Sequence, residues 1–82
     1  MKFNLLTPAK HVAELDAAYV NIPGDAGDFG VRPGHMPLVS TLREGGTVEV
    51  TETTGTKHTF KVTAGFADIR ADDVTVLAEA IQ

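Results

Sequence analysis

Apolar and polar residues alternate along the second half of the chain with the period of two that half-buried β-strands show. Residues 47–52 and 57–63 both follow this pattern, and a loop around Gly55 separates them. Residues 65–70 and 74–79 form a second pair, joined by short polar residues that suit a turn. The pattern therefore predicts two consecutive β-hairpins.

The first half is less regular, but its apolar segments end at turn-forming residues. Residues 3–7 stop at Pro8, and residues 17–22 stop before a Pro-Gly pair. Residues 37–42 form another short strand. Residues 11–16 fit either one turn of helix or a strand, and the strands expected on both sides favour the strand.

These segments together predict an all-β fold with no convincing helix. About eight to ten short strands, with turn signals about every 8–12 residues, are typical of an antiparallel β-sandwich or a flattened barrel. In the last strand the adjacent residues Val76 and Leu77 are both apolar, so neither face of this strand is expected to be fully exposed to solvent. That strand is predicted to be a central strand or a contact edge.

Composition limits the possible functions. A chain of 82 residues makes one domain, residues 1–82, because domains take about 100–150 residues. The formal net charge of −4 argues against nucleic acid as a partner. There is no cysteine, which excludes disulfides, thiolate metal sites and a cysteine nucleophile. We find neither an apolar run of about 20 residues nor a signal peptide, so we expect a soluble chain that meets a membrane only through partners.

The densest motif is residues 23–37, which are rich in glycine and proline. A phosphate-binding loop is disfavoured, because acidic residues lie among the glycines and no helix follows. We expect structural turns in which the glycines supply positive φ angles. The glycines concerned are Gly24, Gly27, Gly30 and Gly34. Between them, Asp28 and Phe29 are predicted to form an acidic tip suited to a basic partner loop.

Catalytic and metal-binding chemistry finds little support. His11, His35 and His58 lack the short spacings of a metal site. Ser40, the only serine, lies in a predicted strand without the sharp turn that exposes a nucleophile. We therefore expect no catalytic residue, metal or cofactor, and we expect His35 to fix the shape of its turn. The residues alone predict a soluble β-sandwich that binds something.

Three segments carry a family resemblance. Residues 22–38, IPGDAGDFGVRPGHMPL, resemble the signature of the ε subunit of F-type ATP synthases. Residues 65–69 with 74–78 resemble the closing hairpin of that family, and residues 3–8 resemble its first strand. The matches come in the family's order and cover essentially the whole chain.

The resemblance implies a noncatalytic rotor subunit whose sandwich contacts the shaft subunit γ and the loops of the membrane c-ring. Asp28, Phe29 and His35 correspond to the c-ring contact, where negative charge would complement the partner loops. For γ the resemblance implies a contact through one face of the sandwich and not through a sequence motif. We expect that contact near Leu38, Leu42, Val76 or Leu77. The implied location is the cytoplasmic face of a bacterial inner membrane, or its organellar equivalent, reached through these partners.

The chain ends where the family usually continues into a helical hairpin. That hairpin inhibits ATP hydrolysis and in some members binds ATP, so neither property is assigned to residues 1–82. Whether the hairpin is naturally absent or was left off stays open. The alternative function is a free-standing sandwich that binds a small apolar or sugar ligand on Phe29 and Tyr19. An enzyme would need Ser40 or the histidines to converge.

Overall fold

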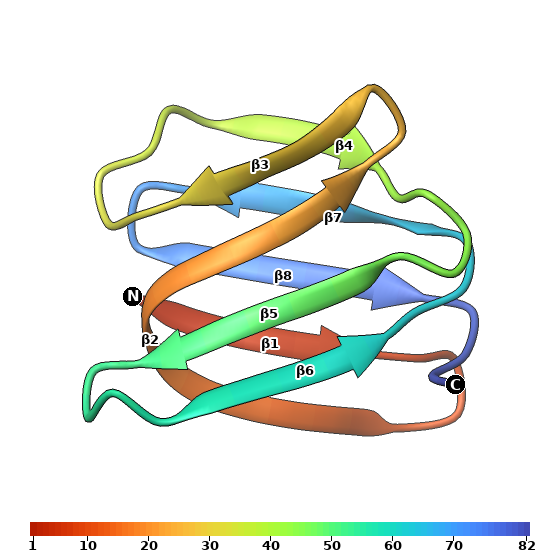
Figure 1. Cartoon of the computed structure of the whole chain (residues 1–82), viewed down its shortest axis with the longest axis horizontal. Helices are drawn as coiled ribbons and strands as arrows, with labels where there is room; N and C mark the ends of the chain where they lie inside the picture. The colour runs from red at the N-terminus through yellow and green to blue at the C-terminus, as the bar shows by residue number, and fades with distance from the viewer.

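The computed structural model describes residues 1–82 and contains eight strands and no helix, hence no helix that could cross a membrane. The strands are β1 (Lys2–Leu6), β2 (His11–Gly24), β3 (Gly27–Val31), β4 (Leu38–Thr41), β5 (Thr47–Glu52), β6 (Lys57–Lys61), β7 (Gly65–Arg70) and β8 (Asp73–Ala78). They pair in the order β4-β7-β8-β1-β2-β5-β6, with β3 beside β2. This path folds into two layers, with β5 and β6 in front of β1 and β8 (Figure 1). The predicted all-β sandwich is confirmed, and the sheet does not close into a barrel.

Both predicted hairpins are present. β5 and β6 pair antiparallel with Val48 opposite Phe60, and β7 and β8 pair antiparallel with Gly65 opposite Ala78. Residues 11–16 are a strand rather than a helical turn, as the flanking strands indicated. The alternation of apolar and polar residues and the turn residues were sufficient to predict these strands, because each hairpin pairs two strands that are neighbours in sequence.

β2 is one strand of 14 residues, where the sequence predicted two short ones. Its first part pairs with β1 and its second part pairs with β3 and β5. The register against β5 shifts between Ala17 and Tyr19, which places a bulge where β2 passes from one layer to the other. A bulge bends a strand and increases its twist, so a single strand can turn the corner of a sandwich.

The antiparallel prediction is wrong at one pair, because β1 and β8 run parallel. β1 lies between β2 and β8, which brings the first strand of the chain beside the last. β8 is therefore a central strand, as predicted from its apolar character. A parallel pair needs a long connection, and here the connection is almost the whole chain.

The core lies between the two layers. Fifteen buried apolar residues form it: Phe3, Leu5, Ala17, Val20, Ile22, Val31, Leu42, Val48, Val50, Val62, Ala67, Ile69, Val74, Val76 and Ala78. No polar or charged side chain is buried among them. Since burying a valine, leucine, isoleucine or phenylalanine contributes about 1.5–3 kcal/mol, this cluster holds the layers together without disulfides.

Candidate functional site

The β2–β3 turn is tied to the end of β4. The turn residues are Asp25 and Ala26, and Gly27 follows with a φ of 134°. The Thr41 hydroxyl donates a 2.8 Å hydrogen bond to Asp25 Oδ2, and the Asp25 amide donates to the Thr41 carbonyl at 3.1 Å. These bonds join two segments from different layers, so the turn has a defined position.

Asp28 lies beside this turn and is paired within the chain. Arg43 Nη2 is 2.7 Å from Asp28 Oδ1, and Arg43 Nη1 donates to the Gly24 carbonyl at 3.3 Å. Asn21 Nδ2 donates a long 3.5 Å bond to Asp28 Oδ2. The hydrogen bond from Arg43, with its positive charge and the Asn21 amide, lowers the pKa of Asp28 below its ordinary 3.8. The Asp28 side chain remains 49% exposed, so it stays ionised and accessible at neutral pH.

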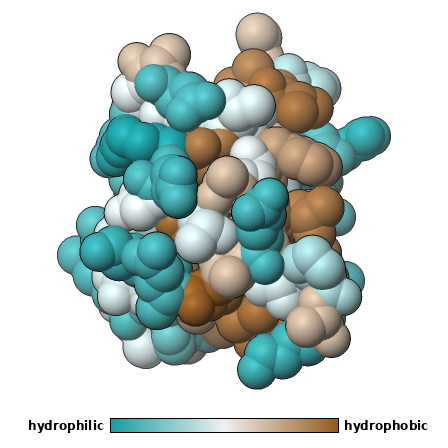
Figure 2. Space-filling view, turned by 90° about the vertical axis from the view of Figure 1, so that its right-hand side faces the viewer, coloured by the Kyte–Doolittle hydropathy of each residue, from teal (hydrophilic) through white to brown (hydrophobic).

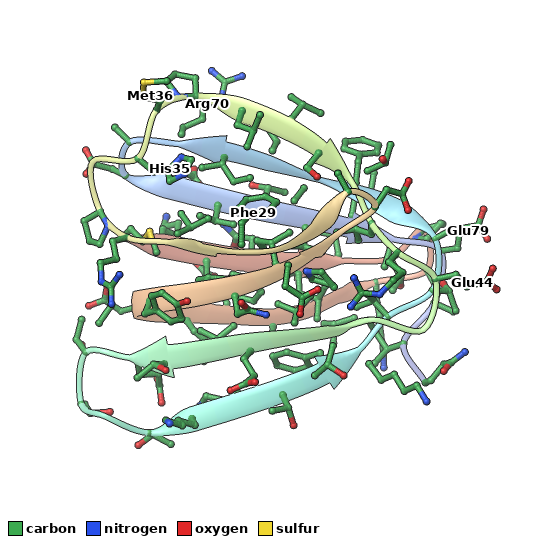
Figure 3. All side chains as sticks on the ribbon, turned by 45° about the horizontal axis from the view of Figure 1, so that its top comes forward. Phe29, His35, Met36, Glu44, Arg70 and Glu79 are labelled. Atoms are coloured by element: carbon green, nitrogen blue, oxygen red, sulfur yellow. The ribbon has the colours of Figure 1, made fainter.

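The sequence predicted that Asp28 and Phe29 project together from a tip, but the structure shows that they do not. Both lie in β3, where Asp28 pairs with Pro23 and Phe29 with Ile22, so their side chains point to opposite faces. Phe29 is half-buried against the core, and its ring centroid is 6.5 Å from that of His35 (Figure 3). The structure therefore separates the acidic group from the Phe29–His35 pair.

His35 contributes to the shape of its loop. Its Nδ1 lies 2.7 Å from the Met36 carbonyl, which makes Nδ1–H the donor. Its amide donates to the Arg32 carbonyl at 3.1 Å, and Gly34 between them has a φ of 89°. Proline at the second position and glycine with positive φ at the third are typical of a type II turn.

The predicted roles of the four glycines are confirmed at only two positions. Gly27 and Gly34 have positive φ, whereas Gly24 and Gly30 do not. Gly24 lies at the end of β2, where a Cβ would be 2.9 Å from the Gly27 carbonyl oxygen. Gly30 lies within β3 under the Tyr19 ring. At these two positions glycine is required by close packing instead of by backbone conformation.

An apolar surface lies on the outer face of β7 and β8. Phe66 and Leu77 are opposite one another in the register and are 44% and 36% exposed. Val39, 66% exposed, faces the same side on β4, where it pairs with Asp68. We call these three residues the apolar row. Hydrophobic atoms gather on the side of the molecule where β4, β7 and β8 lie (Figure 2).

The four γ-contact predictions divide between core and surface. Leu42 and Val76 are 4% and 0% exposed, so they are core residues and not available to a partner. Leu77 is exposed in the apolar row, and Leu38 is 43% exposed on the edge strand β4. Phe66 was not among the predicted contacts, although it alternates along β7 with the buried residues Ala67 and Ile69. Strict alternation along β7 would have placed Phe66 outside.

The residues considered for metal binding, catalysis or small-ligand binding do not come together. His11 is on β2, His35 follows β3 and His58 is on β6, where its Nε2 is 2.9 Å from Glu52 Oε2. Among residues 1–82 no three histidine or acidic side chains gather as a metal site. Ser40 Oγ donates to the neighbouring Thr41 carbonyl, 3.1 Å away. Tyr19 and Phe29 face opposite sides of their layer, so the two rings cannot stack on one ligand.

Solved structures share this fold. A chain of the Euglena gracilis mitochondrial ATP synthase, in a structure of OSCP, F1 and c-ring, matches 98% of the chain with a TM-score of 0.84 and 23% identity. The match covers 51% of that chain. A chain from a structure of the central stalk and c-ring of the Tetrahymena thermophila mitochondrial ATP synthase matches residues 1–82 in full, with a TM-score of 0.79 and 16% identity. That match covers 65% of the Tetrahymena chain.

Sequence relatives are closer. The chain is 42% identical over 79 residues to the ATP synthase epsilon chain of Jannaschia sp., and 35% identical over 82 residues to that of Bacillus subtilis. It spans 58% and 61% of those two relatives, but 90% of the epsilon chain of Caulobacter vibrioides, to which it is 39% identical. The model of the ATP synthase delta/epsilon chain β-sandwich domain matches residues 1–82. By sequence and by fold alike, the chain belongs to the delta/epsilon family of ATP synthase subunits, whose β-sandwich domain it forms.

Proposed function

We propose that this β-sandwich is part of a noncatalytic central-stalk subunit of a proton-translocating F-type ATP synthase. It docks on the γ subunit and on the c-ring loops and resists shear between them as the rotor turns. It lies at the cytoplasmic face of a bacterial membrane, or the equivalent organellar face, held there by these partners. The proposal rests on the family and on one structural observation, the exposed apolar row.

The apolar row supports a protein contact. An outer sheet face that meets only water normally carries polar residues, and a contiguous exposed apolar patch marks an interaction site. Phe66 and Leu77 lie side by side across β7 and β8, and a shallow hollow beside them is lined by Pro8 and Gly65. Because both strands are in the middle of a layer, this surface is rigid. We assign it to γ. Leu38 is not part of this surface, because it pairs with the core residue Ile69 and therefore faces the other side of the layer from Val39.

The acidic end of the molecule supports the c-ring contact. The β2–β3 turn with Asp25 and Asp28 lies next to the β4–β5 loop that carries Arg43 and Glu44. Glu44 and Glu79 both lie at this end (Figure 3). Arg43 neutralises Asp28, so the excess negative charge comes from the acidic residues around the pair. His35 lies in the loop between β3 and β4, at the other end of the molecule from Glu44 and Glu79 (Figure 3), so we assign the c-ring contact to the acidic end without His35.

Calorimetric titration into a γ-containing ATPase complex that lacks its own ε tests the γ assignment. We expect saturable one-to-one binding, and we expect Leu77→Ser to weaken it by about tenfold, since a central apolar anchor contributes more than about 1 kcal/mol. Met36→Ser is the matched control, because Met36 is exposed and apolar but lies beside Arg70 at the other end of β4 (Figure 3). Equal effects of the two variants would contradict the assignment, and no binding by the parent chain would contradict the proposed function.

The c-ring assignment needs a different pair of variants. Asp28→Asn keeps the shape of the side chain, removes the charge and leaves Arg43 unpaired, so association with the c-ring is expected to weaken at low salt. Asp72→Asn removes the same charge from the exposed β7–β8 turn, which lies beside the Gly34 turn at the other end of the molecule. Unchanged association of Asp28→Asn with the c-ring, measured at low ionic strength, would exclude Asp28 from the contact.

A further inference from the structure

Tyr19 and Arg32 form an ordered pair on the outer face of the layer that contains β2, β3 and β5. The Tyr19 ring packs on Gly30, where a Cβ would lie 2.6 Å from Cε1 and 2.7 Å from Cζ. The Arg32 guanidinium carbon is 4.7 Å from the centroid of the same ring. The missing side chain at Gly30 thus lets the ring lie against β3, within reach of the cation.

Arg32 is held at both its backbone and its side chain. Its carbonyl closes the type II turn by accepting the His35 amide, and the Gly34 amide donates to the Ala71 carbonyl at 2.8 Å. The cation–π contact with the Tyr19 ring, 4.7 Å from the guanidinium carbon, restrains the side chain. A cation restrained in this way loses less conformational entropy when it binds a partner than a free lysine side chain does.

Neither member of the pair has a polar partner within the chain. Arg43 pairs with Asp28 and Arg70 pairs with Asp68, whereas Arg32 has no carboxylate within 4.0 Å. The Tyr19 hydroxyl makes no hydrogen bond. Both groups are donors, and the chain as a whole carries a net charge of −4. The guanidinium fork and the phenol therefore stay available for an acceptor from outside.

We propose that Tyr19 and Arg32 form an interaction surface for the carboxylate of an aspartate or glutamate on a partner protein. A planar carboxylate matches the two parallel N–H groups of a guanidinium, and tyrosine and arginine are the residues that most often dominate protein interfaces. Glu49 and Asp28 lie on the same face of this layer, so a doubly charged phosphate would be repelled more than a singly charged carboxylate. The surface is on the layer opposite the apolar row and does not depend on the proposed function.

An NMR titration of the full chain tests the inference. The Nε–H signal of Arg32 and the ring signals of Tyr19 are followed while a blocked glutamate-rich peptide, the matching glutamine peptide, or inorganic phosphate is added at low salt. We expect a saturable shift of Arg32 with the glutamate peptide, and binding about tenfold weaker with the glutamine peptide. Arg70, which is paired with Asp68, is the internal reference for nonspecific attraction.

Variants separate this surface from general electrostatics. Arg32→Lys keeps the charge but loses the fork, and Tyr19→Ala frees the guanidinium, so both are expected to weaken peptide binding several-fold. Lys57→Gln removes an exposed charge from β6 and is expected to leave binding unchanged. The inference is overturned if Arg32 shifts no more than Arg70, if phosphate competes as well as the glutamate peptide, or if Lys57→Gln is as harmful as Arg32→Lys.

Discussion

Gly30→Ala is expected to destabilise the fold, although the backbone at this position would accept alanine. Gly30 has no positive φ, so replacing glycine within a strand would ordinarily stabilise by about 0.5–1 kcal/mol through the unfolded state. The new Cβ would instead lie 2.6 Å from Tyr19 Cε1 and force the ring away from β3. Overpacking costs about 1–3 kcal/mol, and losing the exposed Arg32–Tyr19 stack costs about 0.5–1 kcal/mol.

The net destabilisation is therefore about 1–3 kcal/mol. For a domain of this size, 1 kcal/mol lowers Tm by about 4–8 °C, which thermal unfolding followed by circular dichroism measures easily. Urea titration at fixed temperature gives the free energy of unfolding directly.

A double-mutant cycle with Tyr19→Ala identifies the cause. Without the ring there is no clash, so Gly30→Ala in the Tyr19→Ala background is expected to be neutral or slightly stabilising. The coupling free energy between the two positions is then more than about 1 kcal/mol, as for residues in direct contact. The same loss of stability in both backgrounds would refute the role of the Tyr19 ring.

Three further outcomes are expected. Gly34→Val forces a β-branched residue into a φ of 89° and is expected to cost at least about 1–2 kcal/mol in urea unfolding, and parent-like stability would contradict the type II turn. Leu5→Ala, at a side chain with no exposed surface, is expected to lose about 2–5 kcal/mol, and a loss below 1 kcal/mol would show that the site collapses to fill the cavity. Asp28 has a lowered folded-state pKa, so the stability it contributes is present above its ordinary value of 3.8 and is lost as pH falls through the folded value. In Arg43→Gln the carboxyl pKa measured by NMR is expected to rise toward that ordinary value, and an unchanged pKa would show that the ion pair does not form in solution.

Residues close in sequence determined much of the fold. Alternation in residues 47–52 and 65–70 predicted strands and hairpins correctly, because the pleat repeats every two residues and the turns join adjacent segments. The Pro33-Gly34 pair predicted a turn with positive φ, because the proline ring and the missing Cβ of glycine favour such a turn without any distant contact. The family motif around Asp28 is also readable from consecutive residues.

The tertiary structure alone decided the features that depend on distant segments. Parallel pairing of β1 with β8 and the bend of β2 through its bulge follow from how two layers bury one core. The pairing of Asp28 with Arg43 joins β3 to the loop that follows β4, and the position of the Tyr19 ring on Gly30 depends on the register of β2 against β3. Val76 and Leu77 are both apolar in sequence, and only the packing of β8 between β1 and β7 determined which is buried and which a partner can reach. Such choices are made by long-range contacts, which local propensity and turn chemistry do not specify.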